Sequence, residues 1–211
     1  TAGGQVLLTE ELENYPGFPG GIKGYELVDL MVEHTEGYDI TRPTGEVSSI
    51  TGSAGDFLVS SDGGKTTHRA KTVVVCSGAR HRKLGLDRED ELTGKGVSYC
   101  ALCDGNFYRN QVVAVVGGGN SALEEALYLA RIAKKVCVIH RRDAFRGAKI
   151  FQDKLFAMPD KVDVRLDTVI DELSGEDRLS GLALRNVKTN ETSSLPVDGL
   201  FIYVGNVPNT R

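Results

Sequence analysis

The sequence has 211 residues, of which 40% are hydrophobic and 26% are charged, as in an ordinary globular protein with a sizeable core. Its formal net charge of -4 argues against nucleic acid or an anionic membrane as the main partner, because both repel an acidic surface. No apolar run approaches the roughly 20 residues that a membrane span needs, and the first residues do not resemble a signal peptide. Four cysteines are too few for a disulfide scaffold in a chain of this length, so we expect a cytoplasmic protein.

The start of the chain predicts a loop followed by a helix. Gly and Pro are frequent through Lys23, which is typical of loop with little regular structure. Residues 24–38 then show helical periodicity. Leu27, Leu30 and Met31 fall on one face, so we expect an amphipathic helix here.

Residues 45–75 change to the period of β-strands. The pattern predicts a strand, a turn and a strand, then a hairpin turn at 62–64 and a further strand. The apolar run 72–76 predicts a last, buried strand. Residues 84–96 are polar and irregular, which indicates a linker.

A second unit follows this linker and predicts a parallel sheet. Residues 111–116 form a continuous apolar strand, 121–134 an amphipathic helix and 136–140 a second strand. This β-α-β order is the signature of parallel pairing. The fold class is therefore α/β, with a Rossmann-like unit.

The rest of the second unit predicts one more helix and three more strands. The helix is expected at 149–157, and the strands at 162–166, 182–187 and 200–204. The predicted domains are residues 1–83, residues 84–204, and a segment, residues 205–211, that returns to the first domain.

A glycine-rich loop joins the first strand of the β-α-β unit to its helix. Gly117 lets the chain turn tightly, Gly119 lets the backbone approach a pyrophosphate, and Ala122 lets the helix pack close to the sheet. The helix N-terminus would bind the negative charge. The strand–loop–helix–strand context favours a dinucleotide site over the alternative, a purely structural turn.

The end of the next strand indicates which dinucleotide binds. An NAD site carries an acid about 20 residues after the glycines, whereas His140 opens "HRRDAFR" here. Arg141, Arg142 and Arg146 could converge on a 2′-phosphate through paired hydrogen bonds. The alternative is a solvated basic patch, but the pattern favours NADPH.

Two cysteines, Cys100 and Cys103, lie two residues apart just before this loop. Half of a zinc site is one interpretation, but Cys76 and Cys137 fall in apolar runs that predict buried side chains, and the histidines show no paired spacing. A redox pair fits better, because a CxxC motif closes into a small disulfide ring. Asp104 could protonate a leaving thiolate, or could only cap the next turn.

A dithiol beside a nicotinamide site indicates that reducing equivalents pass from one to the other. Hydride carries two electrons, and reduction of a disulfide takes two. Direct transfer from nicotinamide to sulfur is unusual, so a flavin relay is expected between them.

These motifs resemble those of the low-molecular-weight thioredoxin reductases, a group of pyridine nucleotide–disulfide oxidoreductases. The matching stretches are "GGQ…ENYPGFPGGIKG", "VVVCSGA", "KGVSYCALCDGNFYRNQVVAVVGGGNSALEEALYLA", "VIHRRDAFR" and "LFIYVGNVPNT", in the family's order. The resemblance implies a homodimeric flavoprotein with an NADPH-binding domain inserted in an FAD-binding domain. Residues 84–204 would bind NADPH and carry the dithiol, and residues 1–83 would be the partial FAD-binding domain. Thioredoxin would be the protein substrate.

The resemblance also implies roles for single residues. Cys103 would face the flavin, Cys100 would attack the thioredoxin disulfide, and Asp104 would be the acid. The implied cofactor-binding residues, of which the first five lie on the FAD side, are Gln5, Asn14, Ser77, Gly78, Ala79, Gly117, Gly119, Asn120, Ser121, Glu124, His140, Arg141, Arg142, Arg146 and Gly205. No metal ligand is expected.

Compared with the family, the sequence is expected to be a central piece that lacks the first glycine-rich loop and the last segment of the FAD-binding domain. We therefore expect it to retain little FAD by itself. Three alternatives stay open. They are the flavoprotein reductase of a peroxiredoxin system, which usually has Pro-His between its cysteines, a dithiol oxidase of the same fold, and a non-catalytic NADPH-binding module.

Overall fold

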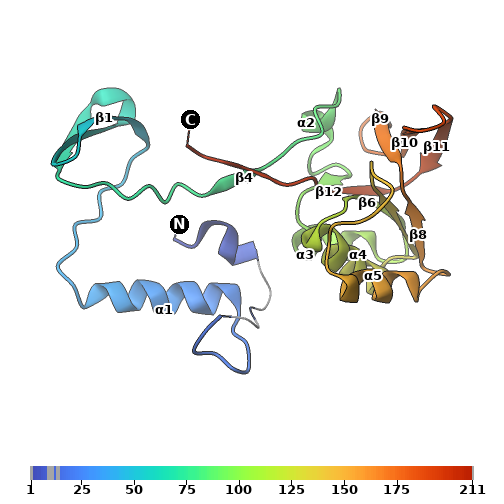
Figure 1. Ribbon diagram of the computed structural model, residues 1–211, viewed down its shortest axis with the longest axis horizontal. Helices are drawn as coiled ribbons and strands as arrows, with labels where there is room; N and C mark the ends of the chain where they lie inside the picture. The colour runs from blue at the N-terminus through green and yellow to red at the C-terminus, as the bar shows by residue number, and fades with distance from the viewer. Residues whose placement is uncertain (1, 9–11, 13–14, 211) are drawn as a thin grey trace. The chain divides into compact units, whose positions relative to one another are not determined.

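The computed structural model describes residues 2–8, 12 and 15–210, which form two compact units (Figure 1). The first unit holds the N-terminal part of the chain through Gly78 and the last residues from Pro208. The second consists mainly of Ala79–Val207. None of the helices in the described ranges has the length and apolar character needed to cross a membrane.

The first unit contains a three-stranded antiparallel sheet of order β1-β2-β3. The predicted strands of residues 45–75 and their turn are confirmed as far as the third strand. The elements of this unit are η1 Gly4–Leu8, α1 Gly24–Glu36, β1 Val47–Ser53, β2 Asp56–Ser61, η2 Asp62–Gly64 and β3 Thr66–Ala70. The short helix η1 lies in the stretch that was expected to be loop.

Helix α1 confirms the helix expected at residues 24–38, but its apolar face is covered only at the start. Leu27 and Val28 are buried. Leu30 and Met31, expected on the same face as Leu27, are 46% and 44% exposed. In the first unit as described, packing against α1 is therefore confined to its first turns.

The prediction of a buried strand at residues 72–76 is wrong. No strand of the described residues pairs with this run, and it forms no regular element. Val74 and Val75 are 84% and 58% exposed, and Cys76, expected to be buried, is exposed as well. Apolar residues form a buried strand only where a neighbouring strand satisfies their backbone hydrogen bonds.

The second unit is built on a five-stranded parallel sheet of order β5-β12-β6-β7-β8. The predicted β-α-β unit is confirmed in β6 Val112–Gly117, α4 Asn120–Ile132 and β7 Lys135–Ile139. The other elements of this sheet and its helices are β5 Val97–Ser98, α3 Ala101–Asp104, η3 Gly105–Tyr108, α5 Lys149–Phe156, β8 Val162–Arg165 and β12 Gly199–Tyr203.

Each face of the parallel sheet has its own apolar core. Val113 and Val115 of β6 pack with α4 and α5 on one face. Ala114 and Val116 point to the other face, toward residues of a second sheet with the order β11-β10-β9. The strands of that sheet are β9 Thr168–Ser174, β10 Gly181–Asn186 and β11 Thr192–Pro196, of which only β10 was predicted. Alternation of side chains along a strand thus divides the core into two layers.

The segment 84–96, expected to be an irregular linker, contains the short helix α2 Glu89–Leu92. Leu92 is fully buried, and Glu89 is 2% exposed. The Glu89 carboxylate accepts hydrogen bonds from three successive backbone N–H groups, at residues 84–86, and from the Tyr99 hydroxyl at 2.6 Å. A buried charge is stable only when it is bonded in this way, so Glu89 holds the segment in shape. After Gly78, β4 Ala79–His81 pairs with β13 Asn206–Pro208.

We predict that Glu89→Ala lowers the free energy of unfolding by about 3 kcal/mol, because it leaves four part-buried donors without their acceptor. Chemical denaturation of the chain measures this loss. The neighbouring Asp90, whose side chain is 77% exposed and pairs with Lys83, is the matched control. Asp90→Ala should cost less than about 1 kcal/mol, and equal losses in the two variants would contradict the role of Glu89.

Candidate nucleotide and dithiol site

The glycine loop between β6 and α4 is shaped by a close backbone contact. A Cβ on Gly117 would lie 2.4 Å from the Tyr203 carbonyl oxygen and 2.7 Å from the Ala122 Cβ. Such distances are impossible for a side chain, so only glycine fits at the end of β6. Ala122 is fully buried, in agreement with the close helix–sheet packing expected from the sequence.

The N-terminus of α4 is open for an anion. Gly119 is the N-cap residue and provides no side-chain hydrogen bond to the first turn of this 13-residue helix. The Asn120 side chain does not cap the first turn of α4 either, because its oxygen accepts a hydrogen bond from the Ala148 N–H at 2.7 Å. Free N–H groups and the helix dipole suit a pyrophosphate there. Ser121 and Glu124 lie on the exposed side of the same helix. The helix still shields the Glu124 carboxyl from part of the solvent, and this partial desolvation raises its pKa.

The "HRRDAFR" segment folds onto the glycine loop. The backbone N–H groups of Arg146 and Gly147 donate hydrogen bonds to the Gly118 carbonyl at 2.8 and 2.9 Å. His140 is only 7% exposed, and a Cβ on Gly118 would lie 2.3 Å from its imidazole. Burial lowers the pKa of His140, and the nearby arginines add to this, so a neutral ring packs against the loop.

Three arginines of this segment remain exposed beside the buried histidine. Arg141, Arg142 and Arg146 all present their side chains to solvent. The structure therefore brings guanidinium groups and the glycine loop to one edge of the sheet, at the carboxyl ends of β6 and β7. This is the place where ligands bind in open α/β sheets. His140 differs from the arginines, because it supports the loop from inside.

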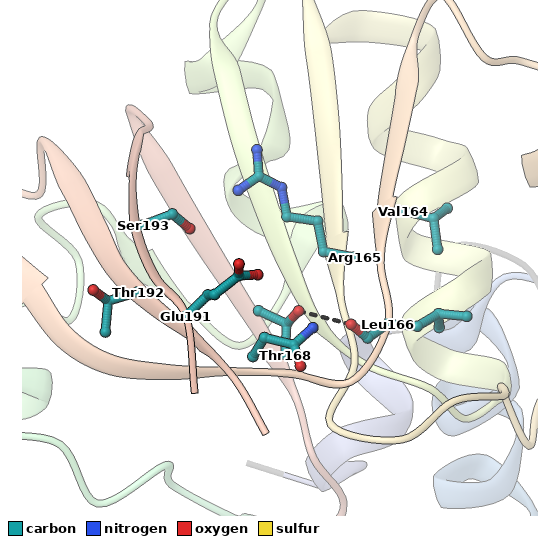
Figure 2. A pocket seen from close by; sticks show the side chains of 8 residues that line it. Val164, Arg165, Leu166, Thr168, Glu191, Thr192 and Ser193 are labelled. Carbon is teal, nitrogen blue, oxygen red and sulfur yellow. Dashed lines mark hydrogen bonds between the residues drawn. The ribbon is translucent and has the colours of Figure 1, made fainter. Parts of the chain in front are cut away.

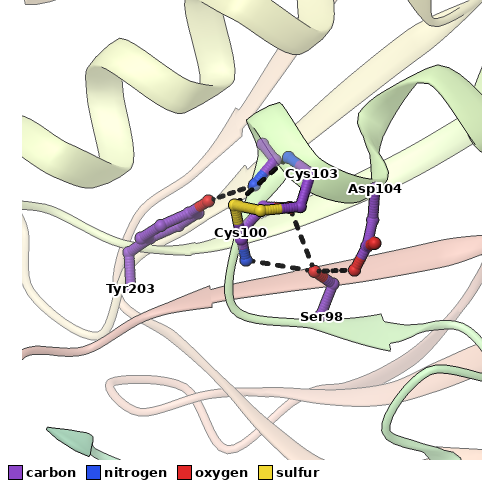
Figure 3. The surroundings of a disulfide bond; sticks show 6 residues. Ser98, Cys100, Cys103, Asp104 and Tyr203 are labelled. Atoms are coloured by element: carbon purple, nitrogen blue, oxygen red, sulfur yellow. Dashed lines mark hydrogen bonds between the residues drawn. A yellow bond between two sulfur atoms is a disulfide. The ribbon is translucent and has the colours of Figure 1, made fainter. Parts of the chain in front are cut away.

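Cys100 and Cys103 are joined in a disulfide, as the sequence predicted, with their Cα atoms 5.3 Å apart (Figure 3). Cys100 is the N-cap residue of α3, and its sulfur accepts the Cys103 N–H at 3.1 Å. Ser98 lies beneath this turn: its hydroxyl accepts the Cys100 N–H at 3.0 Å and donates to Asp104 at 2.7 Å. Asp104 is thus fixed next to the disulfide by a hydroxyl rather than left free.

Sequence reasoning missed Tyr203, which bonds to the dithiol turn, and Glu125, which acts on Tyr203 through its charge. The Tyr203 hydroxyl accepts a hydrogen bond from the Ala101 N–H at 2.7 Å (Figure 3). Burial raises the pKa of Tyr203, and the charge of Glu125 on α4 raises it further. One carboxylate oxygen of Glu125 is buried and has no hydrogen-bond partner among the residues that the structure describes. The only sequence signals were a tyrosine at the end of a predicted strand and a second glutamate after Glu124.

The two other cysteines are free. Cys137 is buried, as expected, and burial raises the pKa of its thiol to about 12. Cys76 is exposed, contrary to expectation. Across the described ranges, no cluster of three or more His, Cys, Asp or Glu side chains is arranged to hold a metal ion.

The residues expected on the FAD side are spread over several elements. Gln5 lies exposed on η1, Ala79 begins β4, and Asn14 lies outside the described residues. Ser77 and Gly78 exchange hydrogen bonds with Asn209, so the "CSG" motif lies beside the "PNT" motif. Gly205, the last of the expected cofactor-binding residues, is exposed, and its carbonyl accepts the Arg82 N–H at 2.9 Å.

A separate pocket of about 530 Å³ lies between β8 and the antiparallel sheet (Figure 2). In it the Thr168 hydroxyl donates to the Leu166 carbonyl at 2.7 Å, and Arg165 forms an ion pair with Asp163. The lining residues are Val164, Arg165, Leu166, Thr168, Asn186, Glu191, Thr192 and Ser193. None of them belongs to the predicted site.

Glu125 should make the free energy of unfolding depend on pH. Burial raises its pKa to about 7, and Glu124 adds to the rise, from about 4.3 in an unfolded chain. The folded state thus keeps its proton to higher pH, so the free energy of unfolding falls as pH rises from about 4.3 to about 7.

We expect Glu125→Gln to remove this loss. Its stability relative to the unmodified chain should rise between pH 5 and pH 8 by about 1–2 kcal/mol, allowing for partial exposure of the carboxyl. Chemical unfolding at the two pH values measures the gain. Glu172→Gln, which changes an exposed carboxylate on β9, is the control and should show no such gain. A gain for Glu125→Gln that is the same at both pH values would contradict the assignment.

Comparison with known proteins identifies the family. The profile of the pyridine nucleotide-disulphide oxidoreductases matches residues 1–211. The thioredoxin reductase of Streptomyces coelicolor is 48% identical over 211 residues, which cover 100% of this chain and 65% of that protein. The thioredoxin reductase of Listeria monocytogenes is 41% identical over 210 residues, which cover 99% of this chain and 65% of that protein. The chain thus spans about two thirds of these relatives.

Solved structures show the same fold. The thioredoxin reductase of Lactococcus lactis, in the FR conformation, superposes with a TM-score of 0.87 at 40% identity, over 97% of this chain and 67% of that one. The thioredoxin reductase of T. acidophilum superposes with a TM-score of 0.84 at 31% identity, over 100% of this chain and 68% of that one. With a family match along its full length, the chain belongs to the pyridine nucleotide–disulphide oxidoreductases.

Proposed function

We propose that this chain carries the nucleotide-binding and dithiol-bearing part of a thioredoxin reductase that uses NADPH and FAD. The observation that supports it most directly is the disulfide of Cys100 and Cys103, held in the same unit as a dinucleotide-type glycine loop. The relatives reported above are thioredoxin reductases. We extend the proposal to FAD as the flavin, a homodimeric assembly and a cytoplasmic location, as the family resemblance implies.

The residues present fit the two halves of NADPH that the protein must recognise. The open space beside Gly119 and the N-terminus of α4 suit the pyrophosphate. The exposed side chains of Arg141, Arg142 and Arg146 suit the 2′-phosphate. Residues 84–204 are accordingly proposed as the NADPH-binding domain, with residues 1–83 and 205–211 on the FAD side. Bound NADPH supplies a hydride, and bound FAD relays its two electrons toward sulfur.

The dithiol and its neighbours perform the proposed exchange with thioredoxin. In the reduced protein, the Cys100 thiolate attacks the thioredoxin disulfide and forms a mixed disulfide, and one thioredoxin sulfur leaves. Cys103 then attacks Cys100 and releases the second sulfur, so the enzyme is oxidised and thioredoxin gains two electrons and two protons. Asp104, bonded to the Ser98 hydroxyl, is placed to give a proton to a leaving sulfur.

An exposed aromatic residue beside the dithiol supports a protein substrate. Phe107, four residues after Cys103, is 78% exposed on η3. A large apolar side chain in water next to a reactive group is typical of a surface that another protein covers. A small-molecule disulfide would not need such a contact.

The decisive experiment is an assay of thioredoxin reduction by NADPH, using the protein that contains this chain. Cys100→Ser and Cys103→Ser should each abolish turnover, while Cys76→Ser should leave it unchanged, since Cys76 takes no part in the disulfide. Reduction of a peroxiredoxin but not of thioredoxin would overturn the proposed substrate. Nucleotide binding without turnover of any disulfide would overturn the enzymatic role.

We predict that the chain binds NADPH at least about tenfold more tightly than NADH, a difference of about 1.4 kcal/mol. The physical reason is the paired hydrogen bonding of guanidinium groups to the 2′-phosphate. Titration of both nucleotides against the purified chain measures the ratio. Replacing Arg141 and Arg142 by Ala should remove the preference.

Arg131→Ala is the matched control for this titration, since Arg131 is an exposed arginine on α4 that lies over the Tyr128 ring. It should leave the ratio of the two affinities unchanged. Equal affinities for the two nucleotides in the unmodified chain would refute the 2′-phosphate assignment.

A further inference from the structure

Tyr203 connects the glycine loop to the dithiol. It is the last residue of β12, and its backbone lies opposite Gly117 in the parallel pairing of β12 with β6. Its side chain extends to the start of α3, where the hydroxyl accepts the Ala101 N–H at 2.7 Å (Figure 3). Ala101 is fully buried, so no water can replace this hydrogen bond.

The turn that carries the two sulfurs needs such an external anchor. Helix α3 has only four residues, and a helix of one turn does not hold its shape by itself. Its internal bonds lead back to Cys100, whose sulfur accepts the Cys103 N–H and whose carbonyl accepts the Asp104 N–H. The Ser98 hydroxyl fixes Cys100 from one side. The Tyr203 hydroxyl fixes Ala101 from the other.

We propose that Tyr203 is a positioning residue for the dithiol: its hydroxyl holds the first turn of α3 so that the disulfide of Cys100 and Cys103 forms readily and resists reduction. The inference rests on the proposed redox role of this pair.

Loss of the Tyr203 hydroxyl should favour the dithiol over the disulfide for two physical reasons. Without the anchor, the two thiols of the reduced state spend less time within bonding distance, so ring closure is less favourable. The Ala101 N–H, once free, also adds to the positive potential at the helix start and stabilises a thiolate. Both effects shift the equilibrium from the disulfide toward the dithiol.

The surroundings keep the Tyr203 hydroxyl in its neutral form. Burial raises the pKa of Tyr203, and the charges of Glu125 on α4 and Asp104 on α3 act in the same direction. Glu124, the next carboxyl along α4, raises the pKa of Glu125 in turn. A neutral phenol both donates and accepts, so its oxygen is available to the Ala101 N–H at any physiological pH.

The test is the thiol–disulfide equilibrium of the chain with dithiothreitol. Cys100 and Cys103 are alkylated after equilibration at fixed pH, and the oxidised fraction is read by mass. Tyr203→Phe should shift the equilibrium constant toward the dithiol by about tenfold, which corresponds to about 30 mV. A folded Tyr203→Phe with a constant within about twofold of the unmodified chain would overturn the proposal.

Tyr128→Phe is the control. Tyr128 lies on α4 and packs near Gly105, at the far end of the dithiol turn. Over the residues that the structure describes, its hydroxyl has no hydrogen bond, so its removal should leave the equilibrium constant unchanged. A shift equal to that of Tyr203→Phe would show a general packing effect and would overturn the proposal.

A second measurement needs no variant that could fail to fold. Amide hydrogen exchange of Ala101 in the oxidised, unmodified chain should be protected, and exchange at the rate of a free amide would refute the anchor. Neither measurement uses nucleotide, flavin or thioredoxin. A chain that fails to reduce thioredoxin could therefore still confirm the role of Tyr203. A negative result for Tyr203 would, in turn, not contradict the proposed function.

Discussion

The second unit depends on how closely β12 approaches β6 at Gly117. The Tyr203 carbonyl and the Ala122 Cβ occupy the space that a side chain at this position would need. Any other residue at Gly117 would therefore push β12 or α4 away from the end of β6. The same glycine thus brings the N-terminus of α4 close to the end of β6 and sets the position of Tyr203, whose hydroxyl bonds to the dithiol turn.

The register of the parallel sheet determines that the Tyr203 side chain lies on the same face as the dithiol turn. Along β12, Phe201 lies in the core on the helical face, while Leu200 and Ile202 lie in the core on the other face. Tyr203 follows the period of two and packs on the helical face, where α3 lies. A shift by one residue would turn it toward the antiparallel sheet and leave the buried Ala101 N–H without an acceptor.

Local patterns predicted the part of the fold in which neighbours in sequence are also neighbours in space. The β6-α4-β7 unit, its glycine loop and the disulfide all lie within a short stretch, and all were predicted. The run 72–76 was wrong because burial of a strand depends on a partner strand, which no local pattern specifies. The segment 84–96 looked irregular because its order comes from a buried carboxylate, Glu89, whose sequence context is that of a surface residue.

In the candidate site, too, local patterns predicted some residues, whereas others are brought together only by the tertiary fold. Motif residues such as Arg142 could be named from the sequence, because their spacing follows from the end of a strand. The link of Tyr203 to Ala101 joins residues 102 positions apart, and neither residue type nor spacing marks it. It exists because β12 is inserted between β5 and β6 in the sheet, beside the strand that leads into the dithiol turn. A strand from the end of the unit therefore contacts both the glycine loop and the dithiol turn, so the two parts of the proposed reaction share one structural support.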